Sequence, residues 1–432
     1  MWHSAPVSSQ PIYFMNTETF SILFLVVLLT SVAIKLWLAQ RQLHHVAAHR
    51  AEVPAAFREQ IGIAAHHKAA DYTSTLTRFG MLTVLFEVLL LLVFTLGGGI
   101  QWLHQATADF IVNPLLQGAA LIACVLLLQT LLEMPLDLYR TFNIEARFGF
   151  NKMTLRLYGI DALKNLLLGA AIGLPLLMGV LWLMAQMGDA WWLYVWGVWV
   201  LFNLLLLYLY PTFIAPLFNK FEPLKDEAQK ANIEALLTRC GFAASGLFVM
   251  DGSKRSAHGN AYFTGFGKTK RIVFFDTLLQ RLTPREIDAV LAHELGHFKR
   301  HHVLQRIVLT FAISLGFLWL LAQLLHAAWF YQGLGVQAQT TATALLLFFM
   351  VLPVFTFLLH PLASAWSRKH EFEADEYAAQ QTDANDLVSA LVKLYQDNAK
   401  TLTPDPLYAT FYESHPPAPV RIAHLQQTGE SK

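Results

Sequence analysis

The chain has 432 residues, of which 55% are hydrophobic and only 14% are charged. This composition is too apolar for an ordinary soluble protein and is typical of an integral membrane protein, whose partner is the lipid bilayer. The formal net charge of +1 gives no basis for nucleic-acid binding, so we expect no nucleic-acid partner.

Seven segments are apolar and long enough to cross a bilayer as helices, which takes about 20 residues each. They lie at residues 19–38, 81–103, 113–134, 158–187, 191–210, 307–330 and 341–366. Lysine and arginine are absent from residues 1–18, 104–112, 188–190 and 331–340, and nearly all 31 of them lie in the other connecting segments. The positive-inside rule therefore predicts a multi-pass protein with its N-terminus outside and its C-terminus in the cytosol.

This pattern divides the chain into four regions. We expect a five-helix membrane region at 1–210, a cytosolic segment at 211–306, a transmembrane hairpin at 307–366 and a cytosolic C-terminal segment at 367–432. Within the second region, a polar helix is predicted around 223–239, and strand-like runs lie at 247–250, 261–264 and 271–275. Glycines and lysines at 265–270 predict a hairpin turn between the last two runs.

The most informative motif is the sequence H-E-L-G-H at residues 293–297. Positions i and i+4 of a helix share a face, so His293 and His297 can each offer an imidazole nitrogen to one zinc ion. Glu294 points away from that face, where it can take a proton from the attacking water. The sequence T-P-R-E at 283–286 is typical of a helix start and places the motif inside a helix. The spacing predicts amide hydrolysis with one zinc ion per chain, so residues 211–306 are the expected catalytic segment.

A third zinc ligand is expected soon after residue 366, because crossings six and seven form a hairpin that returns to the same membrane face. Glu371 and Asp375 lie there, four residues apart on one helical face. We expect Glu371 to be the third ligand and Asp375 to accept the free ring N–H of a ligand histidine. His370 is a weaker alternative ligand, and Glu373 is expected to point to solvent. Three protein ligands leave a position for water, which is the catalytic arrangement of zinc.

These residues resemble the type I CaaX prenyl endopeptidases, the a-factor-converting family of integral-membrane zinc peptidases. The resemblance extends beyond the zinc motif to F-N-I-E-A-R-F-G-F-N-K at 142–152, Y-P-T-F-I-A-P-L-F-N-K-F at 210–221, N-A-Y at 260–262 and S-H-P-P at 414–417. The shorter heat-shock membrane peptidases lack the first two stretches, so they are the second candidate.

The resemblance implies an all-α integral membrane fold in which seven transmembrane helices surround a large chamber. A cytosolic α+β zinc-metallopeptidase domain of gluzincin-like type would close it. Asn260, Ala261 and Tyr262 would lie on an edge strand that binds the substrate backbone by strand addition. His415 resembles the catalytic histidine that donates to the oxyanion. Arg421 resembles an arginine that lies near the metal ligands.

The predicted function is that of a membrane-embedded zinc metalloendopeptidase of CaaX prenyl protease type, cutting on the cytosolic side. Its substrate is expected to be a peptide or protein, prenylated or membrane-associated, in membrane-protein processing or quality control. A zinc-stabilised scaffold or receptor without proteolysis is an alternative, although such a site would not require Glu294. No organelle-retrieval signal is seen, so a bacterial inner membrane is the expected location, with the endoplasmic reticulum as alternative.

Overall fold

The computed structural model describes residues 15–243, 246–264 and 271–430. Within this part of the chain, seven helices are long and apolar enough to span a membrane. They run over Thr17–Ala48, Ile63–Phe94, Pro114–Glu145, Leu155–Gln186, Gly188–Leu217, His302–Leu324 and Thr341–Gln381. The predicted number of crossings is therefore confirmed. The second one ends before residue 103, because the chain turns at Gly98, whose φ of 79° suits glycine.

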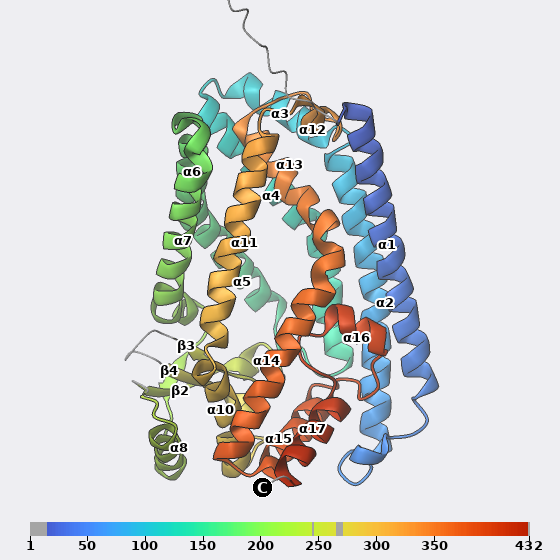
Figure 1. Ribbon diagram of the computed structural model, residues 1–432, viewed down its shortest axis with the longest axis vertical. Helices are drawn as coiled ribbons and strands as arrows, with labels where there is room; N and C mark the ends of the chain where they lie inside the picture. Colours follow the sequence, from blue (N-terminus) through green and yellow to red (C-terminus); the bar gives the residue numbers. More distant parts are fainter. Residues whose placement is uncertain (1–14, 244–245, 265–270, 431–432) are drawn as a thin grey trace, which may run out of the picture.

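The membrane spans run along the long axis of the molecule (Figure 1). They are built from α1 (Thr17–Ala48), α2 (Ile63–Phe94), α4 (Pro114–Tyr139), α5 (Leu155–Leu168), α6 (Leu174–Gln186), α7 (Trp191–Leu209), α11 (His302–Leu324), α13 (Thr341–Thr356) and α14 (His360–Gln381). Turns of π-helix at Arg140–Glu145, Gly169–Gly173 and Tyr210–Ile214 extend α4, join α5 to α6 and extend α7. Two shorter helices, α3 (Gly99–Phe110) and α12 (Ala328–Gln332), lie at the upper end of the view.

The last span is interrupted before it reaches the catalytic motif. Pro353 lies inside α13, and a 3-10 turn at Phe357–Leu359 separates α13 from α14. A proline removes a backbone hydrogen bond and bends the helix, so the interruption has a local cause. As a result α14 leaves the membrane region and packs along the helix that carries the zinc motif.

The remaining elements form a domain below the membrane helices. The helices are α8 (Glu227–Arg239), α9 (Asp276–Leu279), α10 (Pro284–Lys299), α15 (Ala384–Asp397), α16 (Pro406–Tyr412) and α17 (Ala418–Glu430). The strands are β1 (Phe221–Pro223), β2 (Gly246–Met250), β3 (Ala261–Thr264) and β4 (Arg271–Phe275), in the sheet order β1-β2-β4-β3. The three predicted strand-like runs are thus β2, β3 and β4. The predicted turn at 265–270 lies outside the described residues.

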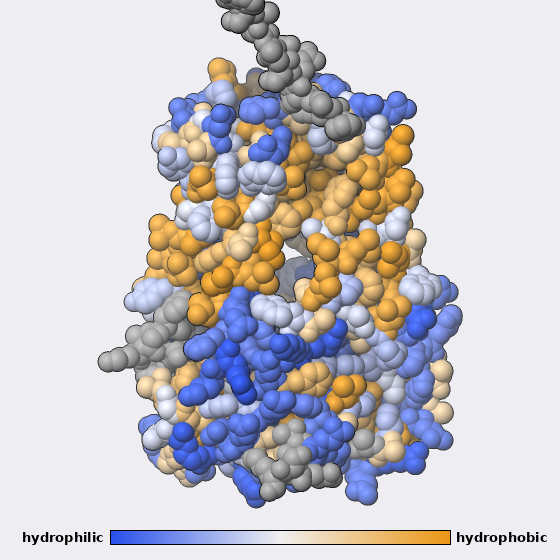
Figure 2. Space-filling model, in the orientation of Figure 1, coloured by the Kyte–Doolittle hydropathy of each residue, from blue (hydrophilic) through white to orange (hydrophobic). Residues whose placement is uncertain are grey.

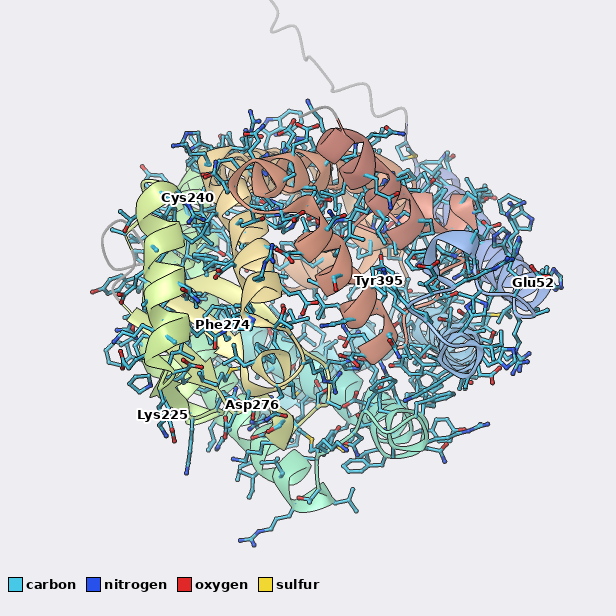
Figure 3. All side chains as sticks on the ribbon, turned by 90° about the horizontal axis from the view of Figure 1, so that it is seen from below. Glu52, Lys225, Cys240, Phe274, Asp276 and Tyr395 are labelled. Atoms are coloured by element: carbon cyan, nitrogen blue, oxygen red, sulfur yellow. The ribbon has the colours of Figure 1, made fainter. Side chains whose placement is uncertain are left out.

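The sheet is mixed, and its register exposes β3 at one edge. β2 runs parallel to β4, whereas β1 and β3 pair antiparallel with their neighbours. Ala261 of β3 lies opposite Phe274 of β4, and β4 carries the fully buried side chains of this sheet. Viewed from below, α8 flanks one side of this domain, with Lys225 just before one end and Cys240 just after the other, and Glu52 lies at the opposite side (Figure 3).

The buried hydrophobic residues gather mainly at the two ends of the molecule. One cluster surrounds Ile233, Phe274 and Leu295 in the lower domain. Another surrounds Phe24, Ile100 and Tyr331 at the opposite end of the spans. A small third cluster joins α2 to the segment after α4.

The wall between these clusters is a single layer of helices. In the most apolar window of the span Leu155–Gln186, only 6% of the residues are buried. Figure 2 shows a hollow in the surface at this level, between an apolar band and the hydrophilic lower domain. Glu87, Glu133 and Asp137 line a pocket between α2 and α4, as expected of polar groups that face a bundle interior. The arrangement is that of helices around a chamber.

Candidate metal centre

The metal centre is built on two packed helices, α10 and α14. Helix α10 begins with a capping box, in which Thr283 and Glu286 bond each other's backbone N–H, and Pro284 occupies the first turn. The helix places His293 and His297 one turn apart on the face that meets α14. Glu371 faces them from α14, so the three residues predicted as ligands come together.

The donor atoms of the three residues form a triangle in which all lie within 4.8 Å of one another. The Nε2 atoms of His293 and His297 are 3.3 Å apart. Nε2 of His293 lies 3.5 Å from Oε2 of Glu371, and Nε2 of His297 lies 3.5 Å from Oε1 of the same carboxylate. Nitrogen and oxygen ligands at zinc–ligand lengths of about 2.0–2.1 Å stand about 3.4 Å from one another around a tetrahedral ion. One Glu371 oxygen, Oε2, is buried with no hydrogen-bond partner in the described part of the chain. The residues therefore fit a zinc ion.

Asp375 and Arg421 contact His293 on the side of the ring away from the other two ligand residues. Asp375 is fully buried, and one of its carboxylate oxygens lies 2.8 Å from Nδ1 of His293. The guanidinium of Arg421 binds the same carboxylate with two hydrogen bonds, of 2.7 and 2.6 Å. Arg421 also lies 3.6 Å from Glu371. A neutral His293 that donates from Nδ1 to Asp375 keeps Nε2 free to bind a metal.

The electrostatics of this pocket favour a bound positive charge. Burial and the Arg421 guanidinium lower the pKa of His293, but hydrogen bonds to Asp375 and Glu371 outweigh them and raise it to about 9. The two carboxylates thus attract a proton to the ring despite its complete burial. A divalent cation placed between the same groups satisfies this demand for positive charge.

Glu294 and His415 supply polar groups beside the ligands. Glu294 is half-buried and makes no hydrogen bond or ion pair with any described residue, so its carboxylate is available to a water molecule. Nε2 of His415 lies 3.4 Å from Glu371, and Nδ1 lies 3.0 Å from the hydroxyl of Ser414. Loss of surrounding water lowers the pKa of His415, although the Glu371 carboxylate opposes this. The neutral ring therefore carries one N–H that it can donate.

The predicted substrate strand lies at the free edge of the sheet. Among the described strands β3 pairs with β4 alone, so its other edge offers backbone groups to an extended peptide. The side chain of Asn260 accepts a hydrogen bond from the backbone N–H of Ala261. The Tyr262 side chain lines a pocket of about 460 Å³ with Lys220 and Arg271. Burial of the Tyr262 hydroxyl raises its pKa to about 12.

Two of the four family-like stretches outside the zinc motif meet at the loop before β3. Asn151, in the stretch 142–152, forms an isolated β-bridge with Ser256. Asn219, in the stretch 210–221, accepts a hydrogen bond of 2.7 Å from Arg255, which also pairs with Asp161 of α5. These contacts tie the membrane spans to the loop that leads into the edge strand.

Sequence reasoning missed one part of the centre. Glu373 was expected to point to solvent, and no role was predicted for His302. Instead, His302 is 1% exposed, and its two ring nitrogens lie 3.0 Å from His297 and 2.8 Å from Glu373. No sequence period links His297 to a residue five positions later, so the spacing gave no signal. His370 stacks on His302 and lies outside the ligand triangle.

Comparison with known proteins accounts for this combination of spans and site. A family model described as the CAAX prenyl protease N-terminal region with five membrane helices matches residues 42–220, and peptidase family M48 matches residues 223–429. This chain belongs to the CAAX prenyl protease 1 family. It is 35% identical to the CAAX prenyl protease 1 homolog of Caenorhabditis elegans, over 94% of this chain and 98% of that protein. It is 32% identical to the CAAX prenyl protease 1 of Saccharomyces cerevisiae, over 88% of this chain and 90% of that protein.

The fold agrees with a solved structure of the family. The crystal structure of S. mikatae Ste24p matches with a TM-score of 0.88 and 29% sequence identity, covering 94% of this chain and 99% of that one. This member of the family is therefore a multi-pass membrane metallopeptidase of CAAX prenyl protease type. The match of the N-terminal membrane region argues against the shorter heat-shock peptidases, and the peptidase match argues against a scaffold or receptor without proteolysis.

Proposed function

We propose that this protein is a zinc endopeptidase that removes C-terminal residues from prenylated CAAX proteins at the cytosolic face of its membrane. The observation that carries the proposal is the triangle of His293, His297 and Glu371, whose donor atoms all lie within 4.8 Å of one another, in a chain of this family. The names of the relatives support the substrate class, because each relative named above is a CAAX prenyl protease 1 or its homolog.

The roles of the site residues follow from their positions. His293, His297 and Glu371 would hold the zinc ion, which when bound would supply a Lewis acid for the hydrolysis of the peptide bond. Glu294, free of other partners, takes the proton of the attacking water and passes it to the leaving amine. His415 donates its N–H to the oxygen on which negative charge develops. Asp375 and Arg421 keep His293 in the tautomer that leaves Nε2 free.

The substrate is held as an extended strand. We place the peptide along the free edge of β3, beside Asn260, Ala261 and Tyr262, where the backbone groups that do not bond β4 can give it sequence-tolerant hydrogen bonds. The Asn260 carbonyl is not one of them, because it accepts a hydrogen bond from the N–H of Phe275. A flexible C-terminal tail meets this requirement, whereas a residue inside a folded domain already has its backbone bonds made. Strand addition thus agrees with cleavage near a protein terminus.

The distribution of basic residues supports a catalytic domain in the cytosol. The loops at the end where α3 and α12 lie contain no lysine or arginine at 104–112 and 331–340. The positive-inside rule places that end outside and the metal centre inside. The relatives named above are eukaryotic, which favours the endoplasmic reticulum over the bacterial inner membrane expected from the sequence.

The test is cleavage of a defined peptide by the purified, detergent-solubilised protein, with products identified by mass spectrometry. Two peptides of one sequence, with and without a prenyl group on the CAAX cysteine, are compared on the wild type, Glu294→Gln and a chelated sample, with zinc content measured in each. We expect wild type to release the three terminal residues of the prenylated peptide. Glu294→Gln should bind zinc and remain inactive. Equal cleavage of both peptides would contradict the substrate class, and cleavage by Glu294→Gln would contradict the proposed mechanism.

A further inference from the structure

The second metal-binding histidine has a layer of polar contacts behind it that differs from the layer behind the first. His293 is held directly by the carboxylate of Asp375. His297 is held by another histidine, because its Nδ1 lies 3.0 Å from Nδ1 of His302. The other nitrogen of His302, Nε2, lies 2.8 Å from a carboxylate oxygen of Glu373. A chain of two imidazoles therefore ends on a carboxylate.

If both imidazole rings are neutral, only one choice of protonated nitrogens satisfies every contact from His297 through His302 to Glu373. Nε2 of His297 faces Glu371 and His293, so a metal-binding His297 carries its proton on Nδ1. That N–H can donate to His302 only if Nδ1 of His302 is bare. His302 then carries its proton on Nε2, where Glu373 accepts it. Each hydrogen bond therefore determines which nitrogen of the next ring carries the proton, and the last acceptor is the carboxylate of Glu373.

The backbone and the packing both hold His302 in this place. Its neighbour His301 has a φ of 60°, in the left-handed region that non-glycine residues rarely occupy, and this turn separates α10 from α11. The His302 ring is 1% exposed and stacks on the His370 ring at 3.9 Å between centroids, with an angle of 5° between planes. A buried ring that stacks on a neighbour and is held at both nitrogens by polar partners has one orientation.

We propose that His302 is the positioning residue for His297, and that Glu373 fixes the tautomer of His302. His302 touches neither substrate nor metal. It acts through His297, keeping the Nε2 lone pair of that ring aimed at the metal position. This inference rests on the proposed function, because it takes His297 to be a zinc ligand.

The experiment measures zinc affinity rather than activity alone. Full-length protein is purified as wild type, His302→Phe, Glu373→Ala and His301→Asn, and each is titrated with zinc against a competing chromogenic chelator. His302→Phe keeps an aromatic ring for the stack on His370 and removes both nitrogens. His301→Asn is the control, because the exposed His301 side chain makes no hydrogen bond or ion pair with a described residue and asparagine tolerates the left-handed backbone.

We expect His302→Phe to bind zinc about 10- to 100-fold more weakly than wild type, as other losses of support behind metal ligands do. Glu373→Ala should change affinity in the same direction by less, and His301→Asn should match wild type. With cobalt in place of zinc, the visible absorption of His302→Phe should shift, because one ligand ring is no longer held. At saturating zinc its kcat should fall while the KM for the peptide stays close to wild type, because β3 is unchanged.

Wild-type affinity and an unchanged cobalt spectrum in both His302→Phe and Glu373→Ala would overturn the proposal. If His302→Phe fails to fold, Glu373→Ala decides, since Glu373 is partly exposed and tolerates truncation. Failure of the proposed function looks different: a wild type that binds no zinc, or that binds zinc and cuts no prenylated peptide, contradicts the enzyme assignment whatever the variants do.

Discussion

Gly296 lies directly against Ala374, and this contact sets the distance between the two helices of the metal centre. A Cβ atom added at Gly296 would lie 2.9 Å from the Cα and 3.1 Å from the carbonyl oxygen of Ala374. Both are backbone atoms, so they cannot turn aside. Since the ligands come from both helices, the absence of a side chain at Gly296 helps bring Glu371 within reach of the two histidines.

Gly296→Ala should therefore destabilise the folded protein, although alanine is favoured over glycine inside a helix by about 1 kcal/mol. The overpacked contact is expected to cost about 1–3 kcal/mol of unfolding free energy and to lower zinc affinity at least tenfold. Thermal unfolding and zinc titration measure both. Gly316→Ala is the control, because a Cβ at Gly316 of α11 would meet no atom within 4 Å. Equal behaviour of the two variants would show that the helix spacing is not set at Gly296.

Asp375→Asn removes the charge that pairs with Arg421 and orients His293. Asp375 is fully buried and receives two hydrogen bonds from the guanidinium. We expect about 10- to 100-fold weaker zinc binding and a loss of stability of about 3 kcal/mol, because a buried positive charge loses its main partner. The exposed neighbour Glu376 on the same helix gives the control Glu376→Gln. A zinc affinity equal to that of the control would contradict the role of Asp375.

The pH dependence of stability should carry a contribution from Asp288 on α10. Burial, aided by Asp386 and opposed by Arg239, raises the pKa of Asp288 to about 6, above the ordinary value of 3.8. The folded protein therefore holds a proton that the unfolded chain has released, so this contribution favours folding below about pH 4 and is lost as pH rises through 6. Asp288→Asn should stabilise the protein by about 1 kcal/mol at pH 7, after allowance for solvent screening of a half-exposed group, and by nearly nothing at pH 4. Unfolding curves at both pH values measure the difference, and a gain that is the same at each would refute this origin.

Removal of the metal should lower the melting temperature, because a zinc ion held by His293, His297 and Glu371 would join α10 to α14 in the folded state only. At a free zinc concentration 100 times the Kd, binding adds about 2.7 kcal/mol to the free energy of unfolding. Melting is followed with added zinc and with a chelator, for wild type and for His293→Ala. The chelator should lower the melting temperature of the wild type but not that of His293→Ala. A fall of equal size in the variant would mean that the chelator acts at a site other than the His293 metal centre.

The sequence predicted those features that depend on local patterns. The T-P-R-E start of α10, the strands β2 to β4 and the seven spans each arise from spacing, capping or hydrophobic length. Glu371 could also be predicted as a ligand from the sequence, because a membrane hairpin must bring its two ends to the same face of the membrane. The metal triangle thus followed from a helical period and a topological constraint, with no knowledge of packing.

Features that depend on packing could not be predicted in the same way. His302 reaches His297 only because His301 adopts a left-handed backbone, which no period of the sequence indicates. Glu373 contacts His302 once that ring is in place, although the position of Glu373 on α14 alone suggested that it points to solvent. The role of Gly296 also stays hidden in the sequence, since the atom it would strike belongs to a helix some 80 residues further on.

The separation of the two hydrophobic clusters has a consequence for what this protease can admit. Each cluster lies at one end of the ring of helices, and in the span Leu155–Gln186 between them only 6% of the most apolar window is buried. We expect a protein substrate to enter sideways, between spans, with an unstructured tail leading and its folded body left outside the ring of helices. The length of the unstructured tail, rather than the size or fold of the protein that carries it, would then decide which clients are cut.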